Sequence, residues 1–130
     1  ACLDRVVSCL EEESQGQQFF FVNLVDTDMH FGHRRDIQGY HDAVAMIDGR
    51  LREILPLLSE EDILIISADH GCDPGFTGTD HTREYVPLLI YSKQIAVTDL
   101  GVRNCFCDVA QSLASYFNIG PMKNGKTFLE

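Results

Sequence analysis

Aspartate and histidine side chains recur directly after two apolar runs of this sequence, residues 19–25 and residues 63–66. Both runs are typical of buried β-strands, and open α/β sheets place their chemistry at strand ends. Six acidic and imidazole residues follow the runs in three pairs: Asp28 with His33, Asp69 with His70, and Asp80 with His81. Their types and positions predict a metal centre, and their number favours more than one metal ion.

The spacing of these residues limits the kind of metal centre. Mixed carboxylate and imidazole ligands favour Mn, Zn or Fe over calcium. Asp69 and His70 are adjacent, so their side chains point in different directions and suit a place between two metals. His81 lies twelve positions after Asp69, across a glycine-rich loop, and could fold back toward it. Two metals about 3.5–4 Å apart form a standard clamp for phosphoryl transfer.

Other polar residues near these motifs carry weaker signals. His30 has no obvious partner, and we leave it out of the predicted site. His41 falls on a predicted helix, where a solvated or packed side chain is the simpler interpretation. Arg34 and Arg35 are equally compatible with surface ion pairs and with phosphate contacts.

The composition of the chain excludes some classes of binding partner. The 130 residues carry a formal net charge of −10, which argues against nucleic acid or an anionic membrane as the main partner. No apolar stretch approaches the ~20 residues of a membrane span. The five cysteines contain no C-x-x-C pair, so we predict reduced thiols and a cytoplasmic protein.

Hydrophobic periodicity outlines the elements that must position these residues. The predicted elements are a helix over 2–14, a strand over 19–25, a helix over 36–55, a strand over 63–67, a loop over 69–86, a strand over 86–91 and a helix around 109–117. The first two strands, joined by the long helix, imply a right-handed parallel crossover. Three strands are few for such a sheet, and the first residue is Ala1, so we expect a piece of a longer protein.

Four segments resemble signature segments of the phosphopentomutases, and the resemblance as a whole covers nearly the whole chain. The four segments are residues 25–36, 67–71, 78–89 and 125–129. Phosphopentomutases belong to the alkaline phosphatase superfamily, with a binuclear metal core and a separate cap domain. The resemblance implies an α/β fold, part of a three-layer α/β/α sandwich with a mostly parallel sheet. Residues 1–130 would be one domain, the C-terminal portion of that core, without its N-terminal segment and cap.

The resemblance also implies roles for individual residues. One metal would be bound by Asp28, His33 and His81, and the other by Asp69 and His70. The second metal also needs an Asp and a phosphorylated, nucleophilic Thr, both expected upstream of this chain. Cys72 follows the Asp-His-Gly motif where the family has Asn, a mild departure that affects no ligand.

The activity implied is interconversion of (deoxy)ribose 1-phosphate and 5-phosphate, with two Mn²⁺ ions and other divalent metals as possible substitutes. Its partners would be a pentose phosphate and the rest of the enzyme chain, and the fragment alone would be inactive. One alternative is another superfamily member, a phosphatase or a cofactor-independent phosphoglycerate mutase. In that mutase the gap matching Asp28 to His33 is one residue shorter. A non-catalytic metal-binding fragment is the other alternative.

Overall fold

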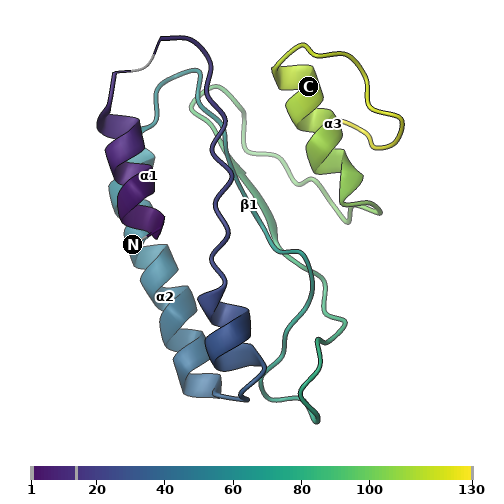
Figure 1. Ribbon diagram of the computed structural model, residues 1–130. Helices are drawn as coiled ribbons and strands as arrows, with labels where there is room; N and C mark the ends of the chain where they lie inside the picture. The colour runs from purple at the N-terminus through teal and green to yellow at the C-terminus, as the bar shows by residue number, and fades with distance from the viewer. Residues whose placement is uncertain (1, 14, 130) are drawn as a thin grey trace. The chain divides into compact units, whose positions relative to one another are not determined.

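Two separate units make up the computed structural model, which describes residues 2–13 and 15–129. The N-terminal unit extends to residue 93, the C-terminal unit begins at residue 94, and each is described here by itself. The N-terminal unit contains α1 (Cys2–Glu11), the π-helix η1 (Thr27–Gly32), α2 (Ile37–Ile54), the 3-10 turn η2 (Leu55–Leu57), β1 (Leu64–Ser67) and β2 (Leu88–Tyr91). The C-terminal unit contains α3 (Cys107–Tyr116) (Figure 1). The single domain predicted over residues 1–130 stays a prediction.

Helix α2 confirms the long helix predicted from periodicity. It begins after Asp36, whose carboxylate accepts a hydrogen bond from the Gly39 backbone N–H at 2.9 Å and so satisfies a free donor of the first turn. It ends where Pro56 enters η2, because proline removes a backbone donor and clashes with the preceding turn. Among the helices that the structure describes, none is both long and apolar enough to cross a membrane.

Helix α1 packs against α2 and η2. The predicted helix over 2–14 is confirmed from Cys2 to Glu11, whereas Ser14 lies outside the described residues. An ion pair of 2.7 Å joins Asp4 on α1 to Arg50 on α2. Ile54 and Leu58 are the buried apolar side chains of this unit, and they lie where α2 runs into η2.

Strands β1 and β2 form an antiparallel pair, with Leu64 opposite Tyr91 and Ser67 opposite Leu88. The positions of both strands confirm the predictions over 63–67 and 86–91. Their pairing differs from the mostly parallel sheet, because the sheet in the described part of the chain consists of these two strands alone. The α/β class is therefore observed, while the three-layer sandwich stays a prediction.

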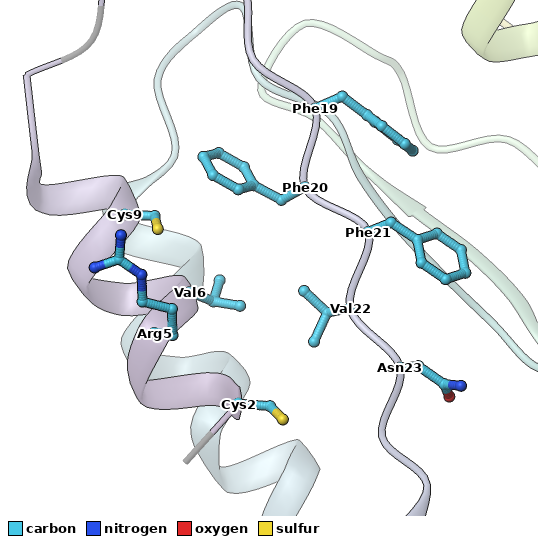
Figure 2. A pocket seen from close by; sticks show the side chains of 9 residues that line it. All are labelled: Cys2, Arg5, Val6, Cys9, Phe19, Phe20, Phe21, Val22 and Asn23. Atoms are coloured by element: carbon cyan, nitrogen blue, oxygen red, sulfur yellow. The ribbon is translucent and has the colours of Figure 1, made fainter.

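The predicted strand over residues 19–25 is wrong for this structure. The segment runs without regular secondary structure, and Phe19, Phe21 and Val25 are 58%, 83% and 42% exposed. A strand needs a neighbour to pair its backbone groups, and within the described residues no strand pairs with this segment. The parallel crossover expected from it is therefore absent from the described sheet. One side of the segment borders a largely apolar hollow against α1 (Figure 2).

The C-terminal unit is organised by polar side chains of α3, the helix predicted around residues 109–117. Three of them accept hydrogen bonds from backbone N–H groups of the terminal segment 122–129: Gln111 from Met122 at 2.8 Å, Asp108 from Lys126 at 2.8 Å, and Ser112 from Phe128 at 3.0 Å. Ser112 is fully buried and Asp108 nearly so. An extended segment thus lies on α3 because helix side chains, rather than a second strand, satisfy its backbone.

A disulfide joins Cys105 to Cys107, the first residue of α3. The prediction of reduced thiols is wrong for this pair. The turn brings the two Cα atoms to 5.2 Å, within the range that a disulfide spans. Cys2, Cys9 and Cys72 are free thiols, as predicted.

Acid should loosen the terminal segment by protonating Asp108. The Lys126 N–H that donates to this carboxylate holds its pKa below the usual value, and the Arg103 guanidinium at 2.7 Å lowers the pKa further. A carboxyl with a lowered folded pKa stabilises the fold above its unfolded pKa of about 3.9 and loses that contribution as pH falls through the folded value. We expect the hydrogen-exchange protection of residues 122–129, corrected for intrinsic rates, to fall over that acid range.

Two variants test this prediction. Asp108→Asn should lower the protection already at pH 6 and remove its acid dependence. Asp99→Asn removes an exposed carboxylate of the same unit and should behave as the wild type. Unchanged protection at pH 6 in Asp108→Asn would contradict the assignment.

Candidate metal centre

Three of the predicted metal ligands meet in the N-terminal unit. One ligand atom from each of Asp28, His33 and His81 lies within 4.8 Å of the other two. The Nε2 atoms of His33 and His81 are 3.2 Å apart, and each is 3.4 Å from an oxygen of Asp28. Two nitrogens bound to one cation at about 2.1 Å lie roughly 3.0–3.4 Å apart at ordinary coordination angles. The separations therefore match those of three ligands around one cation.

A π turn brings Asp28 and His33 together. The backbone N–H of His33 donates to the Asp28 carbonyl at 3.0 Å, which is the i to i+5 bond of a π-helix. This turn stacks residues five positions apart, whereas an α-helix stacks those three or four apart. The sequence predicts no helix between the strand over 19–25 and the helix over 36–55, because a six-residue π-helix leaves no periodic apolar pattern. Such turns are frequent at functional sites.

His81 reaches this turn from the loop that connects β1 to β2. Gly71 and Thr82 form an isolated antiparallel bridge, and the Thr82 N–H donates to the Gly71 carbonyl at 3.1 Å. The loop thereby returns on itself next to His81. Gly32 allows the segment that follows β1 to pack closely against η1. A Cβ at this buried position would collide with the Cys72 sulfur.

A hydrogen bond on the far side of the His33 ring sets its tautomer. Nδ1 of His33 lies 2.5 Å from the Thr79 carbonyl oxygen. A carbonyl can only accept, so Nδ1 carries a proton, and in the neutral ring Nε2 then presents its lone pair toward Asp28 and His81. Metal-bound histidines are oriented by this kind of outer contact.

The chemistry of the group fits a divalent cation. Among the residues that the structure describes, none forms a hydrogen bond with the buried Oδ1 of Asp28, and Nε2 of His81 lies 3.4 Å from it. A buried, unpaired carboxylate oxygen is costly, and a bound cation would remove that cost. Two imidazole lone pairs and a carboxylate form the mixed ligand set preferred by Mn, Zn and Fe.

Asp69 and His70 lie outside the converging group. His70 stacks on the His81 ring, with the ring centroids 3.6 Å apart and the planes 15° from parallel. Its Nδ1 lies 3.1 Å from the Gly71 carbonyl, and its Nε2 is 3.6 Å from Asp69 Oδ1. The Asp69 side chain is 88% exposed. The pair is thus adjacent to the group but belongs to a separate, open arrangement.

Cys72 lies beside the group as a neutral thiol. Burial raises the pKa of Cys72, and the nearby Asp28 carboxylate raises it further. Burial likewise raises the pKa of Tyr40, followed by the effects of Cys72 and Asp28. The Cys72 sulfur is not one of the converging ligand atoms.

The remaining residues considered from sequence have other roles. His41 is solvated, as one of its two interpretations held, with a 74% exposed side chain 3.2 Å from Asp42. His30 lies 3.8 Å from Asp26 and is not part of the converging group. Arg35 forms no ion pair with a described residue, and its guanidinium donates instead to backbone carbonyls of the loop that carries His81. Sequence reasoning missed this contact, since nothing in residue spacing reports a carbonyl.

Most of this chain is similar in sequence to known proteins. A family model described as the metalloenzyme superfamily matches residues 2–121. The chain is 52% identical over 120 residues to a phosphopentomutase of Shewanella sp. (strain ANA-3), which covers 92% of this chain and 30% of the relative. It is 55% identical over 109 residues to a phosphopentomutase of Vibrio cholerae (strain M66-2), covering 84% of this chain and 27% of the relative. The chain thus spans less than a third of the length of these curated relatives.

The family match covers nearly the whole chain and includes Asp28, His33 and His81, together with Asp69 and His70. The converging carboxylate and imidazole groups agree with a metal-dependent protein. On these grounds the chain belongs to the metalloenzyme superfamily.

Proposed function

We propose that this chain supplies metal ligands to a phosphopentomutase, which interconverts (deoxy)ribose 1-phosphate and 5-phosphate. The observation that carries the proposal is the convergence of Asp28, His33 and His81 on one point. The sequence is about 50% identical to phosphopentomutases over most of the chain, and this similarity supports a pentose phosphate as the substrate.

The proposed centre is binuclear. Asp28, His33 and His81 would bind one metal, and Asp69 with His70 would bind part of the other. The stacking of His70 on His81 supports two adjacent sites, because it holds the second pair beside the first group. The exposure of Asp69 leaves its carboxylate open to further ligands from outside this chain.

Manganese is the metal that we propose, with other divalent ions as substitutes. A divalent ion here would neutralise phosphate oxygens during transfer. The residues of this chain would orient the ligands of that ion. The Thr79 carbonyl fixes the proton of His33 on Nδ1, and the π turn places Asp28 opposite His33.

The remaining parts of the proposal concern the whole enzyme. A nucleophilic Thr, one further Asp and the cap that grips the sugar would come from outside this sequence. The chain would then complete a three-layer α/β/α sandwich in the cytoplasm. The exposed apolar side chains of Phe21, Val22 and Val25 support a larger assembly, because extended apolar surface of this kind ordinarily marks an interaction site.

Replacing one ligand should reveal the metal site. His81→Ala should weaken Mn²⁺ binding by more than about tenfold, the loss typical even of outer partners of a metal ligand. His41→Ala is the matched control and should bind as the wild type, because His41 is solvated on α2. Isothermal titration calorimetry measures both, and equal affinities in the two variants would refute the ligand assignment.

A chimera tests the activity. The chain would replace the matched 120-residue segment of the Shewanella sp. (strain ANA-3) relative. We expect Mn²⁺-dependent interconversion of ribose 1-phosphate and 5-phosphate, retained in His41→Ala and lost in His81→Ala. A folded chimera that turns over a phosphoglycerate or an aryl phosphate, but no pentose phosphate, would favour the alternatives.

The 130-residue chain by itself should show no mutase turnover while still binding metal. The reason is that the proposed nucleophile is not among its residues. A coupled assay for ribose 5-phosphate at saturating Mn²⁺ measures this, with the active chimera as the positive control. Clear turnover by the chain alone would contradict the division of roles.

A further inference from the structure

One guanidinium group holds the loop that carries His81. Arg35 donates from Nη1 to the Asp73 carbonyl at 2.8 Å, from Nη2 to the Asp80 carbonyl at 2.8 Å, and from Nε to the Gly78 carbonyl. Three carbonyls spread over eight residues of chain therefore converge on one side chain. The Asp80 carbonyl belongs to the peptide bond that leads directly into His81.

The backbone of Arg35 is shaped for this contact. Its φ of 57° lies in the left-handed region, which a long side chain rarely adopts unless its surroundings require it. The turn is closed by the Arg35 N–H to the Gly32 carbonyl at 3.1 Å and by the Asp36 N–H to the Phe31 carbonyl at 3.0 Å. The backbone conformation after η1 thus directs the Arg35 side chain toward residues 73–80.

The charge environment favours carbonyls as the partners of Arg35. Among the described residues, no carboxylate forms an ion pair with its guanidinium. The guanidinium presents a rigid planar fork of five N–H donors, and three of its nitrogens donate here. A lysine ammonium is a compact charge and cannot reach three carbonyls in one plane.

Arg35 and His33 together form a brace between two segments. His33 binds the Thr79 carbonyl, and Arg35, two positions later, binds the carbonyls on either side of it in the loop, those of Gly78 and Asp80. Four consecutive residues, 78–81, therefore contact the residues that follow η1. The position of His81 relative to His33 is set by this brace.

We propose that Arg35 is a positioning residue for the metal centre, which holds residues 73–80 so that Nε2 of His81 faces His33 and Asp28. The inference rests on the proposed ligand set and adds to it a residue that touches no metal. Arg34, its neighbour in sequence, has an exposed side chain and no part in the brace.

Calorimetric titration of the 130-residue chain with Mn²⁺, and separately with Zn²⁺, tests the role. Arg35→Ala should lower affinity by about 10–100-fold, the range for removing an outer partner of a metal ligand. Arg35→Lys should recover only a small part of the loss, and Arg34→Ala should bind as the wild type. In a His81→Ala background, Arg35→Ala should cause no further loss, because the group that it positions is gone.

A measurement on metal-free protein gives a second readout. Nitrogen-15 imidazole spectra should show His33 protonated at Nδ1 in the wild type and in Arg34→Ala. In Arg35→Gln, which keeps a polar side chain but removes the guanidinium donors, the loop carbonyl is released and the tautomers should mix. Circular dichroism melting identifies any variant that fails to fold, and Arg35→Gln then replaces Arg35→Ala in the titrations.

The outcomes separate the two proposals. Wild-type affinity in folded Arg35 variants, or a full additional loss in the His81→Ala background, would overturn the positioning role. Wild-type affinity in His81→Ala would instead overturn the ligand set, whatever Arg35 does. Non-additive losses at Arg35 and His81, with a mixed His33 tautomer in Arg35→Gln, would support both.

Discussion

Two segments that lie 48 residues apart in sequence meet at the pair His33 and His81, and the meeting depends on hydrogen bonds to backbone carbonyls. The imidazole of His33 and the guanidinium of Arg35 bind the carbonyls of residues 78–80. Without these bonds the long loop would carry His81 on a segment with few apolar contacts. Loops of this kind sit at the low-stability end of a fold, so the polar brace replaces the packing that a loop lacks.

Electrostatics explains why such a brace is needed. The chain carries twice as many acidic as basic residues, and Asp28 presents a buried oxygen that forms no hydrogen bond with a described residue. Imidazole lone pairs and a carboxylate that face the same point repel one another in the absence of a cation. Contacts to Nδ1 of His33 and to the loop backbone must therefore hold the side chains in place. These contacts leave the ligand atoms themselves free to bind a cation.

Sequence patterns predicted much of the framework. Helix α2 was recognisable from its apolar periodicity, and strands β1 and β2 were recognisable from their short apolar runs. Residues 19–25 have the same apolar character, yet they form no strand, because strand formation depends on a partner that no local pattern reports. The disulfide of Cys105 and Cys107 was missed for a related reason, since spacing does not report the turn that joins them.

The sequence alone determined which residues have the chemistry to bind a metal. Carboxylate and imidazole types, placed after apolar runs, singled out Asp28, His33, Asp69, His70 and His81. The tertiary structure decided which of them converge: a π turn stacks residues five apart, and a loop folded over Arg35 returns His81 to the same point. Residue type is a local property, whereas convergence depends on backbone hydrogen bonds between distant segments, which become visible only when the chain is folded.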